Sequence, residues 1–294
     1  MFQRVAIVLL AACALVGAFS TGGCLAATNY LDPVGPVYRG SSHAALEFDH
    51  AIRVVTFNIQ FARHIDRAIE ALGSHPELKS ADIVVLQEMD APGVEAIARA
   101  LRMNYVYYPI SVHPKSGRDF GNAVLSPWPI DESRKLLLPH TSWFLKQARG
   151  AVAARIRVEE KTVQVYGLHL GSPLATSGGD RRRQAAAILA DARSIRDPVI
   201  VAGDLNSYGV GAEFEREGFA WPTKHVGGSV RGFSFDHVFV RGLPLSGSVA
   251  GVAHAVKDAS DHRPVWADLR AFEDVTATSA PAPRRAPPSA VPAS

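Results

Sequence analysis

The sequence is poor in cysteine. Its two cysteines, Cys13 and Cys24, both lie near the N-terminus, so the rest of the chain contains none. This excludes zinc-thiolate sites and a cysteine nucleophile from the body of the protein. A chain of 294 residues can be stabilised by its hydrophobic core without disulfides. Any catalytic chemistry must therefore use other side chains.

Long apolar runs are also absent beyond the N-terminus. There, Arg4 precedes the apolar stretch 5–19, and small residues follow through Ala27. This pattern predicts an export signal over residues 1–27. The stretch is shorter than the roughly 20 apolar residues of a membrane-spanning helix. We therefore expect an exported protein, periplasmic or secreted.

Two ways of processing this signal stay open. Cleavage near Cys24-Leu25-Ala26-Ala27 would release a soluble protein, the outcome that we favour. Alternatively, Leu10-Ala11-Ala12-Cys13 or Thr21-Gly22-Gly23-Cys24 would serve as a lipoprotein box and anchor the protein to a membrane.

Strong charge of either sign is lacking as well. Charged residues make up 20% of the chain, hydrophobic residues 47%, and the net charge is only +3. These values indicate a folded domain and are compatible with an anionic substrate, but they do not identify nucleic acid as a partner. The densest basic cluster, Arg181-Arg182-Arg183, is interpreted as a solvated helix face. The chain also lacks a Gly-x-Ser-x-Gly elbow and a Gly-x-x-x-x-Gly-Lys loop.

Composition divides the rest of the chain into three parts. Residues 28–50 are rich in Gly, Pro and Ser, which predicts a linker. Residues 51–272 form the expected folded domain. Residues 273–294 consist mostly of Ala, Pro, Ser and Thr, which predicts a disordered tail.

Within residues 51–272, short β-type runs alternate with helical patterns. Strands are predicted at residues 52–57, 83–86, 122–125, 151–158, 162–170, 199–202, 236–240 and 265–269. Helices are predicted over residues 65–72, 94–101 and 180–194. The order changes from alternating strands and helices to a strand-rich half, which favours packed sheets with helices outside over a uniform parallel barrel.

Polar residues gather at the ends of these strands. They are Asn58, Glu88, His169, the pair Asp204 and Asn206, and the pair Asp261 and His262. A single Asp or Asn after a strand usually forms a turn, because its side chain bonds its own backbone. Several such positions in one chain instead favour a shared site.

The chemistry of this set is that of a metal-dependent phosphoryl hydrolase. Carboxylate and amide oxygens suit Mg²⁺ or Mn²⁺, which keep several waters and need few protein ligands. The carboxylates would come from Glu88, Asp204 and Asp261. Histidines such as His169 and His262 offer acid–base and charge-stabilising functions.

Seven short motifs in order resemble the endonuclease/exonuclease/phosphatase superfamily. They are Thr56-Phe57-Asn58, Leu86-Gln87-Glu88, Gly121-Asn122-Ala123-Val124-Leu125-Ser126, Gly167-Leu168-His169-Leu170, Gly203-Asp204-Leu205-Asn206, Phe235-Asp236-His237-Val238 and Ser260-Asp261-His262-Arg263-Pro264. The resemblance implies an α/β fold, a four-layer α/β/β/α sandwich of two mixed sheets with the site at one end.

The resemblance also implies roles for individual residues. Asn58, Glu88 and Asp261 would lie at the catalytic Mg²⁺ or Mn²⁺, and Asp204 and Asn206 would position the attacking water and contact the phosphate. It further implies that Asp236 orients His262 as general base or electrostatic partner, and that His169 stabilises the phosphate or the leaving group. His237 stands where the family often has an aromatic residue, and we interpret it as a residue of the core or one that supports the site from behind.

The expected function is hydrolysis of a phosphate ester, with nucleic acid and phospholipid head groups both open as substrates. Arg118, Arg149 and residues 181–183 are candidate phosphate contacts. Residues 143–145, Trp-Phe-Leu, either pack over the sheet edge, which we favour, or insert into a lipid surface. A non-catalytic surface or adaptor protein on the same fold is the alternative. We expect a monomer without an obligate protein partner.

Overall fold

The computed structural model describes residues 26–42, 48, 50–114, 116–245, 247–256 and 258–270. The expected tail, and the expected export signal up to residue 25, lie outside the described residues. No helix in the described part of the chain is long and apolar enough to cross a membrane.

Two mixed sheets form the centre of the molecule. The first has seven strands in the order β1-β4-β5-β3-β2-β12-β11. These strands are β1 (Tyr38–Gly40), β2 (Ala51–Asn58), β3 (Ile83–Met89), β4 (Asn104–Val112), β5 (Asp119–Ser126), β11 (Val249–Val252) and β12 (Val265–Arg270). The pair β2 and β3 is parallel and the other pairs are antiparallel.

The second sheet has five strands in the order β10-β9-β8-β7-β6. They are β6 (Ile130–Leu137), β7 (Gly150–Val158), β8 (Lys161–His169), β9 (Val199–Asp204) and β10 (Asp236–Arg241). Here β8 and β9 are parallel, and the remaining pairs are antiparallel.

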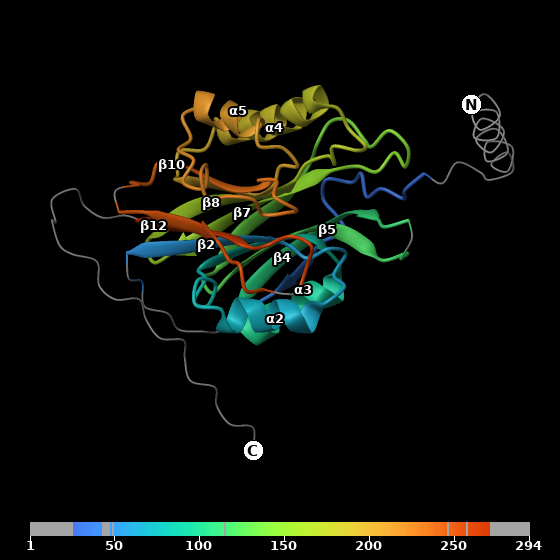
Figure 1. The fold of residues 1–294 in the computed structure, drawn as a ribbon. Coiled ribbons are helices and arrows are strands. Elements are labelled where there is room, and N and C mark those ends of the chain that lie inside the picture. The colour runs from blue at the N-terminus through green and yellow to red at the C-terminus, as the bar shows by residue number, and fades with distance from the viewer. Residues whose placement is uncertain are drawn as a thin grey trace, which may run out of the picture.

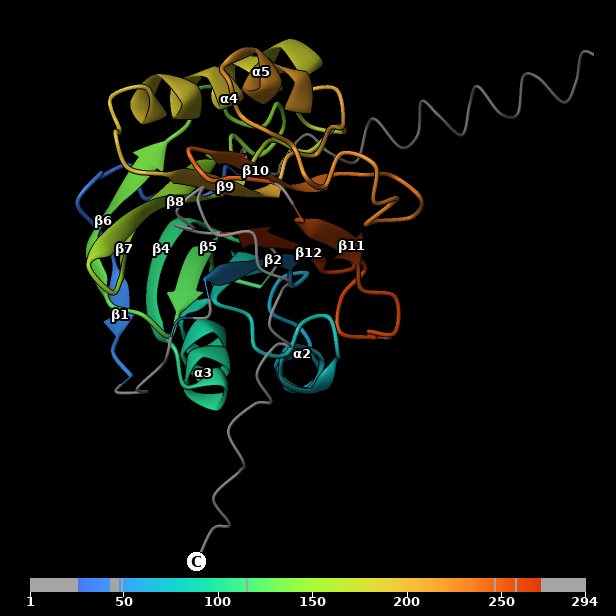
Figure 2. The same ribbon diagram turned by 90° about the vertical axis from the view of Figure 1, so that its left-hand side faces the viewer.

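In the described part of the chain, four helices cover the outer faces. Helices α2 (Ile65–Ser74) and α3 (Ala91–Leu101) lie on the seven-stranded sheet, and α4 (Gly178–Ala192) and α5 (Gly211–Arg216) lie on the five-stranded sheet. Figures 1 and 2 show the resulting order of helix, sheet, sheet and helix layers. The expected four-layer α/β/β/α sandwich is confirmed.

Alternation along the strands creates this layering. Val54 and Val85 point between the sheets, where they meet Val165 and Ile200 of the second sheet. Their neighbours on the opposite face of the sheet pack under α2 and α3. Since successive side chains of a strand point to opposite faces, a strand buried on both faces reads as a continuous apolar run.

The structure contains all the predicted strands and helices, together with elements that the sequence pattern did not predict. These are β1, β4, β6, β11 and α5. Three of the missed strands, β1, β6 and β11, lie at sheet edges. An edge strand tolerates charges, and β6 carries the sequence Ile-Asp-Glu-Ser-Arg-Lys-Leu-Leu, which shows no apolar run.

Part of segment 28–50, the predicted linker, packs against the domain. Residues 38–40 form β1, which pairs with β4. Upstream, the Tyr30 hydroxyl donates to Asp119 Oδ1 over 2.8 Å, and Lys135 Nζ donates to the carbonyls of Tyr30 and Gly35 over 2.8 and 2.6 Å. Backbone pairing and a cation held by carbonyls fix a segment whose composition is typical of a loop.

Candidate active site

The predicted site residues meet where strands of both sheets end. Asn58 is the last residue of β2, His169 of β8 and Asp204 of β9. Asp236 begins the antiparallel strand β10 and is paired in register with Asp204. Since parallel neighbours end at the same edge, this topology collects the polar side chains at one end of the stacked sheets.

A β-bulge positions Glu88. The register of β3 against β5 shifts between Leu86 and Met89, and Glu88 has a left-handed φ of 59°. A bulge redirects the side chain of its extra residue at a cost in backbone strain. Glu88 Oε2 accepts a hydrogen bond of 3.1 Å from the Phe61 amide, so the carboxylate is held at the rim of the cluster.

Asn58 connects the carboxylates of the two sheets. Its Nδ2 donates to Glu88 Oε1 over 3.3 Å and to Asp204 Oδ2 over 3.1 Å. Its Oδ1 accepts from the Gln60 amide over 3.0 Å, which turns the amide nitrogen toward the carboxylates. In this orientation, Asn58 orients two acids and its amide oxygen faces the backbone.

The turn after β9 fixes Asp204 and Asn206. The Asn206 amide donates to Asp204 Oδ1 over 2.7 Å, and Asn206 Nδ2 donates to the Leu170 carbonyl over 3.1 Å. Asn206 has φ of 51°, a left-handed conformation that asparagine tolerates. Gly203, which directly precedes Asp204, has φ of 152°, and a Cβ there would lie 2.0 Å from the Leu168 carbonyl oxygen. Glycine is therefore required where β9 approaches β8.

His262 forms a pair with Asp236. The distance between His262 Nδ1 and Asp236 Oδ2 is 2.8 Å, and His262 Nε2 lies 3.9 Å from Asp204 Oδ2. The Ser260 hydroxyl accepts from the His262 amide over 3.1 Å and donates to the Asn58 carbonyl over 2.6 Å. Ser260 therefore ties the histidine loop to the end of β2.

Asp236, His262 and Asp204 lie in a row, and the pKa values of His262 and Asp204 are both raised. The shift favours the charged form of the histidine and the neutral form of the aspartate. Burial alone would lower the pKa of His262, but the charge and hydrogen bond of Asp236, with Asp204, raise it to about 10. Burial, followed by repulsion from Asp236, raises the pKa of Asp204 to about 7. At neutral pH the row thus holds a cationic imidazole beside a carboxyl group poised to exchange a proton.

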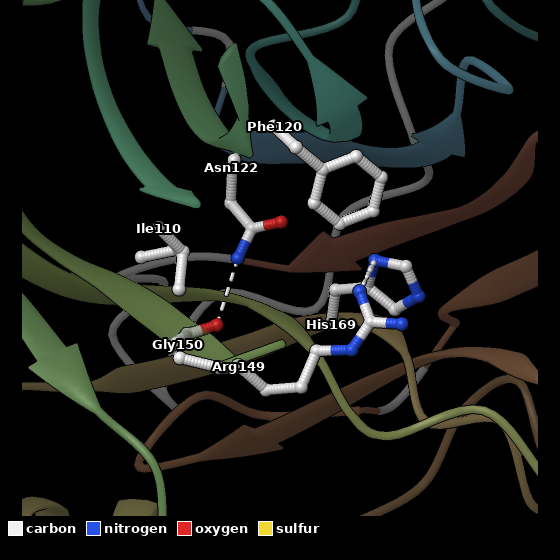
Figure 3. A pocket seen from close by; sticks show the side chains of 8 residues that line it. Ile110, Phe120, Asn122, Arg149, Gly150 and His169 are labelled. Atoms are coloured by element: carbon white, nitrogen blue, oxygen red, sulfur yellow. Dashed lines mark hydrogen bonds between the residues drawn. The ribbon is translucent and has the colours of Figure 1, made fainter. Parts of the chain in front are cut away.

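His169 and Arg149 form the other side of the site, as Figure 3 shows. The distance from Arg149 Nη1 to His169 Nδ1 is 3.5 Å, and the guanidinium lies 5.2 Å from the ring centre of Phe120. His169 Nε2 lies 3.5 Å from Asp204 Oδ2 and 3.9 Å from Glu88 Oε1. Burial, together with the charge of Arg149, lowers the pKa of His169 well below its ordinary value, so this histidine is neutral at pH 7.

A pocket opens beside this pair. Its lining includes Ile110, Phe120, Asn122, Arg149 and His169. Asn122 Nδ2 donates to the Gly150 carbonyl over 2.8 Å, which joins β5 to β7 across the sheets (Figure 3). This small recess therefore combines apolar walls with a buried cation next to His169.

The structure separates the candidate arginines. Arg149 lies in the site, whereas Arg118 pairs with Asp90 over 2.8 Å and Arg181 donates to the Thr176 carbonyl over 3.0 Å. Arg182 and Arg183 lie exposed on α4, as the interpretation of a solvated face predicted. Sequence reasoning named Arg149 only as one of several phosphate contacts, because no motif contains it.

Two further predictions differ in outcome. His237 is fully buried, accepts from Trp221 Nε1 over 3.2 Å, and burial lowers its pKa to about 4. Its interpretation as a core residue is confirmed. Asp261 is exposed, but its charge raises the pKa values of both Glu88 and His262. Asp261 is thus close to the site, and its role as a metal ligand stays a prediction.

The donor set fits a hard divalent cation. Glu88 and Asp204 share the donor Asn58, and burial raises the pKa of both carboxyl groups. Buried acids so close together favour a cation that compensates them. Asp204, Asp236 and His262 also offer ligand atoms within 4.8 Å of one another. Because His262 is already bonded to Asp236, the oxygen pair of Glu88 and Asp204 suits Mg²⁺ or Mn²⁺ better.

The comparison with known families agrees with this geometry. The profile of the Endonuclease/Exonuclease/phosphatase family matches residues 55–262, from β2 to His262. The chain belongs to this family. Members of the family are hydrolases that act on phosphoesters and generally depend on divalent metals.

A curated relative and two solved structures show how far the similarity extends. A UPF0294 protein of Vibrio cholerae is 28% identical over 137 residues, which is 43% of this chain and 47% of that protein. The match thus spans about half the length of the curated relative. Sphingomyelinase C from Streptomyces griseocarneus is 21% identical, with a TM-score of 0.57 over 74% of this chain and 99% of that chain. An endonuclease/exonuclease/phosphatase from Beutenbergia cavernae is also 21% identical, with a TM-score of 0.58 over 75% and 72% of the two chains. These two structures share the fold.

Proposed function

We propose that this chain is an exported phosphodiester hydrolase that depends on Mg²⁺ or Mn²⁺. The observation that carries the proposal is the arrangement of three side chains. Asp236 lies 2.8 Å from His262 Nδ1, and His262 Nε2 lies 3.9 Å from Asp204. Glu88 and Asn58 on one flank, with His169 and Arg149 on the other, complete a site with acids, a base and cations. This set supports an enzyme over an adaptor protein on the same fold.

The residues divide the chemistry between them. Asp204 and Asn206 place the attacking water. Cationic His262 and buried Arg149 stabilise the negative charge that grows on the phosphate oxygens. Neutral His169 hydrogen-bonds the phosphate or the leaving oxygen. Glu88 and Asp204 would hold the divalent cation, and the chemistry it would supply there is Lewis-acid polarisation of the phosphate.

The proposal is tested by hydrolysis of a generic aryl phosphodiester. We expect turnover with Mg²⁺ or Mn²⁺ that EDTA abolishes, and a loss of more than about a hundredfold in Glu88→Gln. Glu132→Gln, which changes an exposed residue of β6, is the matched control and should retain full activity. Turnover that is insensitive to EDTA and to Glu88→Gln, or no turnover at all, would overturn the proposal and favour the adaptor.

Two substrate classes follow from the family and its relatives. The family includes proteins that act on nucleic acids and on lipids, and one structural neighbour is a sphingomyelinase. Plasmid nicking and release of phospholipid head groups by the same preparation separate the two classes. Mixed activity would indicate a broad specificity, whereas action on one substrate assigns the class.

Export and a monomeric state belong to the same proposal. The apolar N-terminal stretch with its small-residue end supports export. Fractionation of cells that produce the full chain, followed by mass determination of the mature N-terminus, distinguishes a cleaved product from a lipid-modified one. Light scattering of the purified protein measures its oligomeric state.

A further inference from the structure

Two loops next to the site expose large apolar side chains. Residues 138–149 join β6 to β7, and residues 170–177 join β8 to α4. Trp143, Phe144 and Leu145 of the first loop are 50%, 79% and 37% exposed, and Leu174 of the second is 86% exposed. We call these four residues the apolar rim. The expectation that residues 143–145 pack over the sheet edge is wrong.

Hydrogen bonds make the apolar rim a continuous feature. The Trp143 amide donates to the Ala175 carbonyl over 2.9 Å, so the two loops lie side by side. Gln184 of α4 braces their bases, since it accepts from the Gly171 amide over 2.9 Å and donates to the carbonyls of Pro139 and His140. Separate loops thus present one surface.

The base of the first loop is polar, buried and hydrogen-bonded, whereas its tip is apolar and exposed. The Ser142 amide donates to the Gln147 carbonyl over 3.0 Å, and the Ser142 hydroxyl accepts from the Gln147 amide over 3.0 Å. Gln147 Nε2 also donates to the Ser111 hydroxyl over 2.9 Å. An ordinary surface loop has polar residues at its tip. This loop instead exposes Trp and Phe to water. An exposed apolar patch of this kind marks a surface that contacts another apolar phase.

The rim has basic neighbours, and Asp180, the acid in the first turn of α4, is ion-paired with Arg183 over 3.0 Å. Neither loop contains Asp or Glu. Lys146 follows Leu145 and is exposed, and Arg182 is exposed with its Nη1 atom near Gly178 at the start of α4. Aromatic and aliphatic tips flanked by basic residues are typical of protein surfaces that lie at the interface of an anionic bilayer.

The N-terminal side of the chain reaches the fold at this rim. The Ala27 amide donates to the Leu145 carbonyl over 2.6 Å, and Asn29 exchanges hydrogen bonds with the carbonyl of Lys146 and the amide of Ala148 over 2.9 and 2.8 Å. In Figure 1 the blue N-terminal segment accordingly runs beside the lime-coloured loops. The first described residues of the chain are therefore hydrogen-bonded to the rim loop itself.

We propose that the apolar rim, with Lys146 and Arg182, is a docking surface for an anionic lipid bilayer. The first rim loop ends at Arg149 and the second begins directly after His169, so a docked protein places its site close to the level of the head groups. Docking itself does not depend on hydrolysis. Only the consequence for lipid substrates rests on the proposed function.

Fluorescence on vesicles tests the docking directly. Of the four tryptophans, Trp128 and Trp221 are buried, Trp266 is partly buried, and Trp143 is the exposed one. With the full chain and vesicles of phosphatidylcholine and phosphatidylglycerol, brominated lipid should quench the emission of Trp143. Trp143→Phe should remove that quenching while binding persists, because phenylalanine still inserts. Equal quenching in both proteins would overturn the proposal, as would a Trp143 response to DNA and none to vesicles.

Matched substitutions measure the contribution of the rim. Phe144→Ser should weaken partitioning into the vesicles by about tenfold. Val249→Ser, at an exposed position on β11, should leave it unchanged. Arg182→Gln should weaken binding to anionic vesicles by about fivefold and leave neutral vesicles unaffected. Equal binding by the Phe144 variant and the wild type would refute the docking surface.

Catalysis provides an independent readout. Phe144→Ser should reduce hydrolysis of vesicle phospholipid and leave kcat/KM for a soluble aryl phosphodiester unchanged, because Phe144 lies outside the site. If neither substrate is hydrolysed by the wild type, the proposed function fails while the vesicle result still decides the docking surface. A parallel loss on both substrates would assign Phe144 to folding and contradict its role in docking.

Discussion

Asn58 and Asp204 end strands of different sheets, and the Asn58 amide donates to the Asp204 carboxylate over 3.1 Å. This bond closes the two sheets at one end. The same amide donates to Glu88 over 3.3 Å, so one neutral side chain aligns two acids. The alignment of the two sheets therefore also sets the positions of the two acids in the site.

The proton on Asp204 makes stability depend on pH. Burial raises its folded pKa to about 7 from an ordinary value of 3.8. The folded protein therefore retains a proton that the unfolded chain releases, and the stability from this group is full below pH 3.8 and is lost as pH rises through 7. In Asp204→Asn this loss is absent. In EDTA, the Tm of the variant relative to the wild type should rise by several degrees between about pH 4 and 7. A constant difference across that range would contradict the raised pKa.

Asp236 controls the charge of His262. In Asp236→Asn the hydrogen bond loses its anionic acceptor, so the pKa of His262 should fall from about 10 toward its ordinary value of 6.5. A raised folded pKa of a histidine means that its stabilising contribution is lost as pH rises through about 10, and in the variant this loss should occur at lower pH. NMR titration of the ring protons measures the shift. Asp131→Asn, which removes an exposed partner of Arg157, is the control and should leave the titration of His262 unchanged.

Arg149 is the buried cation of the site. Arg149→Gln should weaken competitive inhibition by inorganic phosphate by about tenfold or more, because a charge-assisted contact is lost in a desolvated place. It should also raise the pKa of Glu88, whose value the charge of Arg149 lowers. The exposed substitution Arg157→Gln should affect neither quantity. Unchanged phosphate inhibition in Arg149→Gln would exclude this arginine from substrate binding.

Gly203 tests the requirement for close approach of β9 and β8. Gly203→Ala places a Cβ 2.0 Å from the Leu168 carbonyl oxygen at a φ of 152°, so it should destabilise the fold by roughly 3 kcal/mol or more. Gly73→Ala, in α2 with open space around it, should be neutral or stabilising by up to about 1 kcal/mol. Urea unfolding of both variants measures the difference. Equal midpoints would show that the backbone of β9 relaxes without cost.

Much of the fold was predictable because buried strands leave a strong local signal. Strands such as β2 and β9 are covered on both faces, so each reads as an apolar run that ends in a polar residue. The edge strands β1, β6 and β11 carry no such signal, since one side of each meets solvent. Strand β1 lies in segment 28–50, where Gly and Pro hide a strand whose stability comes from pairing with β4.

The sequence by itself determined the layered architecture, the family motifs and most residues that meet in the site, from Asn58 to His262. Those features depend on local periodicity and on residue type. Only the tertiary structure decided that Asn58 directs its nitrogen to the carboxylates, that Arg149 lies against His169 and that Asp261 stays exposed. It also decided that residues 143–145 face outward beside Ala27. These outcomes depend on contacts between segments far apart in the chain, and a contact of that kind leaves no pattern in either segment alone.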